Sequence, residues 1–167
     1  MPAALKRSFA PVVDEGTRVL LLGSLPGEQS LALGQYYGNP RNQFWKLMEA
    51  VTGAALEVLP YPARLDALLR EGVGLWDVVD TASRAGSLDA AIRNHRANSL
   101  SALAATLPAL RAIAFNGGTS ARLGMKALGP AAPWALVPLP SSSPAFTLPL
   151  AQKLERWLAL SAFLDTD

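Results

Sequence analysis

The stretch Arg18-Val-Leu-Leu-Leu-Gly-Ser-Leu-Pro-Gly27 joins a short apolar run to a turn rich in glycine and proline. Such a run predicts a buried β-strand that ends in a tight loop. Similar apolar runs recur at 73–79, 110–115 and 134–139, and each is closed by Asp, Asn-Gly or Pro. Because these runs lack polar alternation and helical patterns lie between them, we expect a three-layer α/β/α sandwich around a central four-stranded parallel sheet.

The first clear helix is expected to start at Asn39, which can cap a helix whose first position is Pro40. Its apolar residues lie on one face at helical spacing, and Gly53 is expected to end it. These residues are Phe44, Leu47, Met48 and Val51.

Two further helices are predicted. Ser87-Leu-Asp89 is typical of a helix entry that continues through 90–92. A last amphipathic helix is expected over about 148–164. Its inward residues would be Leu150, Leu154, Trp157 and Leu158.

Composition predicts one domain over 1–167, because 50% of the 167 residues are hydrophobic and only 17% are charged. The chain has no Cys, which excludes disulfides, thiolate zinc sites and iron–sulfur clusters held by Cys. Its single His, His95, argues against a His-based metal centre and a Ser–His–Asp triad. We therefore expect no metal and no cofactor.

The first ten residues include no apolar run of signal-peptide length, and no window reaches the roughly 18 apolar residues of a membrane span. A cytoplasmic protein is predicted.

The net charge of the chain is only +2, but Asp and Glu are absent from 90–154, where six Lys and Arg residues fall. Eleven of the fifteen basic residues are Arg, whose planar fork suits phosphate oxygens.

Ligands of open parallel sheets bind beyond the carboxyl ends of the strands, so the segments that follow the predicted strands are candidates for a site. These are 23–27, 76–77, 116–118 and 140–145, and the segment 36–45 can reach the same edge. The turn 23–27 matches neither the dinucleotide fingerprint nor the P-loop. A nucleotide cofactor is therefore not expected.

Taken in order, four motifs resemble those of the uracil-DNA glycosylase superfamily over roughly 19–145. They are Gly23-Ser-Leu-Pro-Gly27, Asn39-Pro-Arg-Asn-Gln-Phe-Trp45, Phe115-Asn116 and Leu139-Pro-Ser-Ser-Ser-Pro-Ala145. The second and fourth motifs are most similar to the hypoxanthine-DNA glycosylase branch. The resemblance implies that fold and a DNA glycosylase of base excision repair that hydrolyses the N-glycosidic bond of deaminated bases, hypoxanthine first. Its partner would be double-stranded DNA, and we expect a monomer associated with the nucleoid.

The resemblance also implies roles for individual residues. Asn39 would be catalytic, holding a water below C1′ or bonding the base. Phe44 would stack on the flipped base and Asn116 would read its edge. Backbone N–H groups of Gly23, Ser24 and Leu25 would stabilise the departing base. DNA contacts are expected at Pro26, Gly27, Ser141, Ser142, Ser143, Pro144 and Ala145, with Ala145 or Phe146 as the wedge. These motifs include no Lys to form a Schiff base, so the enzyme would be monofunctional.

The chain departs from several branches at two places. Leu25 stands where they have an Asp or Asn that holds the attacking water, and Leu139-Pro140 stands where they have a His. Both departures predict a weak reaction on uracil. A uracil or mismatch-specific glycosylase and an inactive DNA-binding module of the same fold are the alternatives, followed by a small-molecule α/β enzyme.

Each candidate residue also has a purely structural interpretation. Asn39 can be a helix cap, Phe44 a core residue and Asn116-Gly117 a turn pair. Asp77 can cap a helix, and the serine run can be a plain turn before the last helix.

Overall fold

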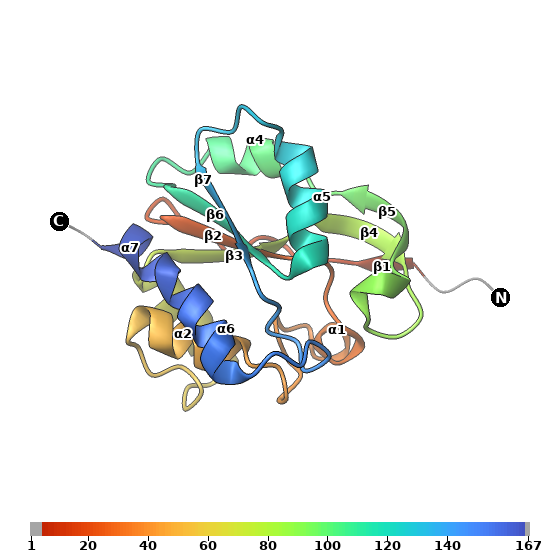
Figure 1. Ribbon diagram of the computed structural model, residues 1–167, viewed down its shortest axis with the longest axis horizontal. Coiled ribbons are helices and arrows are strands. Elements are labelled where there is room, and N and C mark those ends of the chain that lie inside the picture. Colours follow the sequence, from red (N-terminus) through yellow and green to blue (C-terminus); the bar gives the residue numbers. More distant parts are fainter. Residues whose placement is uncertain (1–4, 166–167) are drawn as a thin grey trace.

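The computed structural model describes residues 5–165, so residues 1–4 and 166–167 of the predicted domain lie outside the described residues. A parallel sheet of four strands runs through the middle of the molecule (Figure 1). Its order is β3 (Val73–Asp77), β2 (Val19–Gly23), β6 (Ala112–Asn116) and β7 (Ala135–Leu139). The predicted parallel sheet is therefore confirmed.

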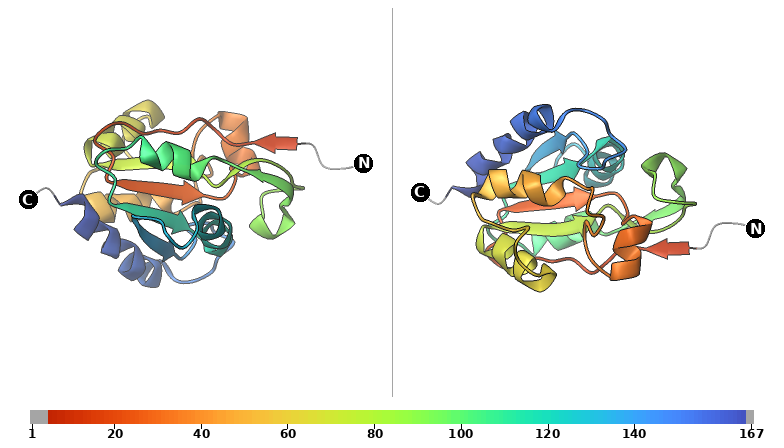
Figure 2. Two further views of the ribbon diagram at one scale, coloured as in Figure 1. Left: turned by 90° about the horizontal axis from the view of Figure 1, so that it is seen from above. Right: turned by 90° about the horizontal axis from the view of Figure 1, so that it is seen from below.

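Helices cover both faces of this sheet, which gives the expected three layers (Figures 1 and 2). One face carries α2 (Phe44–Thr52), α3 (Tyr61–Arg70) and α6 (Leu150–Trp157). The other carries α4 (Leu100–Ala105) and α5 (Gly118–Leu128). In the part of the chain from residue 5 to residue 165, no helix is long and apolar enough to cross a membrane.

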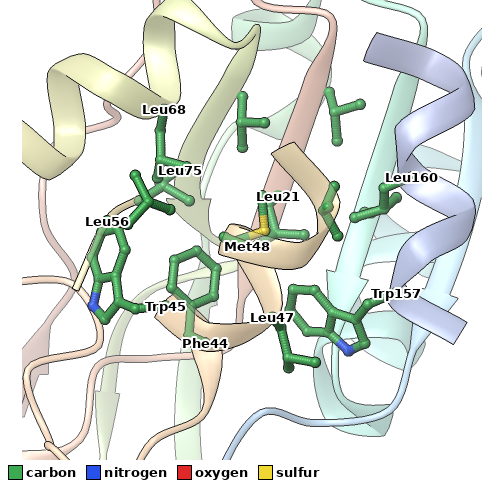
Figure 3. Packing of buried hydrophobic residues seen from close by; sticks show 14 of the residues in the cluster. Leu21, Phe44, Trp45, Leu47, Met48, Leu56, Leu68, Leu75, Trp157 and Leu160 are labelled. Carbon is green, nitrogen blue, oxygen red and sulfur yellow. The ribbon is translucent and has the colours of Figure 1, made fainter. Parts of the chain in front are cut away.

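The central strand β2 explains why its sequence is apolar without alternation. Val19 and Leu21 point into the core beneath α2, α3 and α6, whereas Leu20 and Leu22 point into the core beneath α4 and α5. All four side chains are fully buried, as expected for a parallel strand covered on both faces. Figure 3 shows the first of these cores, in which Phe44 and Trp157 pack around Leu47 and Met48.

A second, antiparallel sheet lies beside the parallel one and was not predicted. Its order is β1 (Leu5–Arg7), β4 (Val79–Ser83) and β5 (Arg93–Ala97). The predicted strand at 73–79 is in fact two strands, because the chain leaves the parallel sheet after Asp77 and joins the other sheet at Val79. A strand of five residues is too short for its pattern of apolar and polar residues to show that the chain passes from one sheet to another.

The helix predicted through 90–92 is wrong. A single 3₁₀ turn, η1 (Asp89–Ala91), precedes β5 instead. In this segment only Ile92 packs against the small cluster of Leu25, Val79 and Ala82. One apolar residue does not make a stripe that can stabilise a helix.

The first helix starts later than predicted. Helix α2 begins at Phe44 with Gln43 at its N-cap, so Asn39 is not the cap and Pro40 is not its first residue. Residues 39–42 form a turn instead, because the Asn42 N–H donates to the Asn39 carbonyl. The predicted end is confirmed, since Gly53 caps the helix in the left-handed region with φ of 77°.

The last helix is broken into three parts. Helix α6 is followed by the 3₁₀ turn η2 (Leu158–Leu160) and by α7 (Ser161–Leu164). Leu158 was predicted to point inward but is 40% exposed, whereas Leu160 is fully buried. The 3₁₀ turn changes the helical phase, and this rotates Leu160 into the core in place of Leu158. A short helix α1 (Glu28–Leu33) completes the fold.

Candidate active site

The carboxyl ends of the parallel strands open into a cavity of about 390 Å³. The turn after β2, the loop before α2 and the loop after β7 supply most of its wall. In the sheet, β2 lies between β3 and β6, so the connections from β2 to β3 and from β3 to β6 run in opposite directions across the sheet. The cavity therefore lies at a topological switch point, where ligands of such sheets bind. Its size is that of a small-molecule or single-base site. Gly23–Gly27, Tyr36, Tyr37, Asn39, Asn42, Asp77, Asp89, Asn116 and Ser141–Phe146 are among the residues that line it.

Asn39 lines this cavity, as its predicted role requires. Its Oδ1 atom accepts a hydrogen bond of 2.9 Å from the backbone N–H of Arg41. Among the described residues, no group accepts a hydrogen bond from its Nδ2 atom. The structural interpretation of Asn39 as a helix cap is wrong, and its amide donors remain available to a water or a base.

Phe44 does not line the cavity, which argues against its predicted place beneath a base. Its side chain is fully buried in the core. Tyr37 lines the cavity instead and stacks on Phe44, with ring centroids 3.8 Å apart and planes 12° apart. Tyr37 takes a left-handed backbone conformation, with φ of 54°, which is unusual for a residue other than glycine. Of the aromatic residues that line the cavity, Tyr37 is therefore the one that rests on Phe44.

The turn Gly23–Gly27 is held from behind by a buried arginine. The Arg84 guanidinium donates to the carbonyl oxygens of Leu25 and Pro26, and it lies 3.8 Å from a carboxylate oxygen of Asp89. Asp89 in turn accepts a hydrogen bond of 2.6 Å from the Ser24 hydroxyl. Since Arg84 is only 1% exposed, it fixes the turn and is not free to attract DNA.

Gly23 has no room for a side chain. A Cβ atom at this position would lie 2.6 Å from Oδ1 of Asp77 and 3.1 Å from the Tyr37 hydroxyl. Leu25 packs into the small cluster with Val79 and Ala82, so its apolar side chain contributes to the packing behind the turn. The close approach of Gly23 to Asp77 explains why the turn begins with glycine.

Asn116 and Ser142 bind each other at the end of β6. Nδ2 of Asn116 donates to the Ser142 hydroxyl at 2.9 Å, and Oδ1 accepts the Ser142 backbone N–H at 2.9 Å. The Ser142 hydroxyl then donates to Oδ1 of Asn42 at 2.7 Å. Because Ser142 is 1% exposed, its hydroxyl faces inward and does not reach phosphates, contrary to the prediction. The amide of Asn116 fixes the loop after β7, and it also lines the cavity.

The outer part of the same loop is exposed. Pro144, Ala145 and Phe146 lie at the rim of the cavity, and Phe146 is 45% exposed. Lys153 lies beneath them, where its Nζ atom donates to Oε1 of Gln43 and to the Ser143 carbonyl. Burial lowers the pKa of Lys153. Its ammonium therefore supports the rim and is not part of a DNA-facing surface.

Acidic groups gather on the opposite wall. Asp77 is 3% exposed, and among the described residues its Oδ2 atom has no hydrogen-bond partner. Burial and then the charge of Asp89 raise the pKa of Asp77 to about 7, although the Arg84 charge opposes this shift. Burial also raises the pKa of Asp89. Burial in this wall thus favours the protonated form of the Asp77 carboxyl group relative to an exposed aspartate.

Basic side chains of the stretch 90–154 lie outside the cavity. Arg93 and Arg96 on β5 are exposed, and His95 is exposed as expected for a solvated residue. They are available to the backbone of a bound nucleic acid. Among residues 5–165, no group of three His, Cys, Asp or Glu side chains is arranged to hold a metal ion.

Sequence reasoning identified the segments of the site but missed several of its residues. Tyr37 and Asn42 fall inside the motif 36–45, but nothing in the spacing indicates which aromatic ring faces the cavity. Asp77 was noted as a residue that follows a strand and was interpreted as a possible cap. Arg84 and Asp89 belong to none of the four family motifs, and Asp89 was interpreted only as part of a helix entry, because their roles depend on the path of the chain between β4 and β5.

Comparison with known proteins gives a consistent result. A family profile described as "Uracil DNA glycosylase superfamily" matches residues 10–162. A hypoxanthine DNA glycosylase of Methanosarcina barkeri is 44% identical over 115 residues, which are 69% of this chain and 73% of that protein. One of Methanosarcina acetivorans is 44% identical over 113 residues, or 68% and 72% of the two chains.

A solved structure has the same fold. It is a solution NMR structure of a Methanosarcina acetivorans protein provisionally assigned to the uracil DNA glycosylases, and it has a TM-score of 0.83. The two sequences are 36% identical, and the alignment covers 98% of this chain and 100% of the other.

Proposed function

Because the chain belongs to the uracil-DNA glycosylase superfamily, we propose that it is a monofunctional glycosylase that releases hypoxanthine from deoxyinosine in double-stranded DNA. Two relatives that are 44% identical bear the name hypoxanthine DNA glycosylase. The observation that carries the proposal is the presence of Asn39 in the cavity wall, outside any helix and with amide donors available. The reaction would begin base excision repair.

Hydrolysis of the bond between base and sugar develops positive charge on the sugar and negative charge on the departing base. The amide of Asn39 can hold a water for C1′ through its Nδ2 donors while the Arg41 N–H orients its oxygen. The side chain of Leu25 has no polar group and cannot share this task. The catalysis we assign to Asn39 is therefore the positioning of water at the sugar.

The flipped base would lie on the ring of Tyr37. Phe44 supports that ring from behind at a centroid distance of 3.8 Å, so the platform is a rigid pair. The edge of the base would face the wall formed by Asp77 and Asn116. This assignment replaces the direct contact expected of Phe44.

Contacts to the DNA itself follow from the exposed rim. Ser141, Ser143 and Pro144 lie where backbone phosphates would pass, and Phe146 is the exposed side chain best suited to fill the vacated stack. Arg93 and Arg96 would add attraction that weakens with salt. We further propose that the protein acts as a monomer at the cytoplasmic nucleoid, where such DNA lies.

A single-turnover assay tests the proposal on labelled duplexes that contain one deoxyinosine or one deoxyuridine, with alkaline cleavage of the abasic product. We expect cleavage at deoxyinosine that falls at least about 100-fold in Asn39→Ala, the scale of a lost positioning group. Gln152→Ala is the matched control, because Gln152 is an exposed amide on α6 outside the cavity wall. Cleavage mainly at deoxyuridine would replace the substrate, and salt-dependent binding without release would indicate an inactive module.

A further inference from the structure

Asp77 lies at the carboxyl end of β3, in the wall of the cavity. It ends β3 in register with Gly23, and its Oδ1 atom would lie only 2.6 Å from a Cβ atom at that glycine. The side chain lines the cavity although it is only 3% exposed. Because Gly23 has no side chain, nothing from that residue covers the Asp77 carboxyl group on the side of the turn Gly23–Gly27.

Within the part of the chain that the structure describes, the Asp77 carboxyl group takes part in no hydrogen bond, and its Oδ2 atom is buried. Among the described residues, nothing donates to Oδ2, and the nearest cation, Arg84, is paired with Asp89 and with backbone carbonyls. A buried carboxylate without a partner is costly, whereas a carboxylic acid carries a proton that it can donate. The geometry therefore favours the acid form of Asp77.

The charged and titratable groups around Asp77 come from three elements. Asp89 on η1 raises the pKa of Asp77, and Arg84 from the segment before η1 lowers it. Tyr36 and Tyr37, from the loop before α2, are buried hydroxyls whose own pKa values are raised above their ordinary range. Asp77 is thus the group in this cluster whose pKa, about 7, allows it to gain and lose a proton near neutral pH.

We propose that Asp77, as a carboxylic acid, donates its proton to N7 of the purine as the purine leaves the sugar. This inference rests on the proposed function, because it requires a purine substrate. The bond between C1′ and N9 breaks with its electron pair on the base, and the proton from Asp77 lets the base leave as neutral hypoxanthine. The water held by Asn39 adds to C1′, and its released proton restores the acid form of Asp77 through solvent.

The same chemistry favours a purine over uracil. N7 of a purine has a free lone pair in the ring that also contains N9. In uracil N1 is bonded to the sugar and N3 carries a hydrogen, so no ring nitrogen can accept the proton. Uracil can accept a proton only at its carbonyl oxygens, so a donor placed at N7 accelerates the release of a purine in particular.

The test compares wild type with Asp77→Asn, which is nearly isosteric, in single-turnover release of hypoxanthine between pH 5.5 and 9. We expect the wild-type rate constant to fall about tenfold per pH unit above about 7. Asp77→Asn should be at least about 100-fold slower at pH 6, with little pH dependence of its own. Asp89→Asn should move the wild-type decline to lower pH, because a charge that raises the pKa of Asp77 is removed.

A second measurement follows the titration in the wild-type protein, and Asp77→Asn serves only to assign the resonance. Carbon-13 NMR of the aspartate carboxyl groups in the wild type should show one resonance that titrates near pH 7 and disappears in Asp77→Asn. An aspartate set that titrates entirely below pH 5, or a wild-type rate that does not fall above pH 7, would overturn the role of Asp77. Release of hypoxanthine in that case leaves the proposed function intact, whereas no release from wild type overturns both.

Discussion

Replacement of Ser142 by alanine tests the interpretation of the loop after β7 as part of a buried hydrogen-bonded network. The Ser142 hydroxyl accepts a hydrogen bond of 2.9 Å from Asn116 and donates one of 2.7 Å to Asn42. In Ser142→Ala, Nδ2 of Asn116 loses its acceptor in a buried site, which costs about 1–3 kcal/mol. Oδ1 of Asn42 keeps the Phe44 N–H, so its loss is nearer about 1 kcal/mol.

The sum predicts a loss of about 2–4 kcal/mol in the free energy of unfolding, or roughly 5–15 °C in Tm for a chain of this size. Urea denaturation followed by tryptophan fluorescence measures the first quantity. Ser143→Ala is the control, because its hydroxyl only accepts the exposed Ala145 N–H. We expect that variant to lie within about 0.5 kcal/mol of wild type. Equal stability of the two variants would refute the network.

Two further perturbations probe the wall of the cavity. In Gly23→Ala the new methyl group would meet Oδ1 of Asp77 at 2.6 Å, so we expect a loss of about 1–3 kcal/mol in stability and of about 100-fold in the single-turnover rate constant. Gly118→Ala, which meets no atom within 4 Å, should leave both unchanged, and a similar result for the two alanines would contradict the close approach. In Asp77→Asn the dependence of stability on pH should change, because folding raises the pKa of Asp77 from 3.8 to about 7. The contribution of the Asp77 proton to stability is complete below about pH 4 and is lost as the pH rises through 7. The Tm of Asp77→Asn relative to wild type should therefore be higher at pH 8 than at pH 4, and an equal difference at both pH values would show that Asp77 has an ordinary pKa.

The parallel sheet was predictable because its signal is local and strong. Four apolar runs, each followed by a turn, correspond to the four observed strands, which lie within or beside the predicted ranges. The strands β2, β3 and β6 are buried as expected, whereas β7 lies at the edge of the sheet and is partly exposed. The predicted family is confirmed, because the family profile matches residues 10–162, which include all four motifs. The predicted fold is confirmed by the similar solved structure. The antiparallel sheet was not predictable, because β1 pairs with β4 between residues more than 70 positions apart, and the pairing of β4 with β5 is interrupted by register shifts.

The sequence by itself determined which segments meet at the site. Strand ends in a parallel sheet share one edge, so the turn at Gly23, the amide of Asn116 and the loop at Ser141 had to converge. The motif around Asn39 could be added because it lies in the connection between the first of these strands and the next helix of the sheet face.

Only the tertiary structure decided what each side chain does within that site. Whether Tyr37 or Phe44 faces the cavity depends on a left-handed residue at position 37, and the orientation of Ser142 depends on partners from two other elements. The raised pKa of Asp77 likewise results from burial and from the charge of Asp89, against the opposing charge of Arg84. Arg84 and Asp89 both come from the segment between β4 and β5. Periodicity and spacing encode contacts along the chain, whereas burial and pairing arise only when distant segments pack.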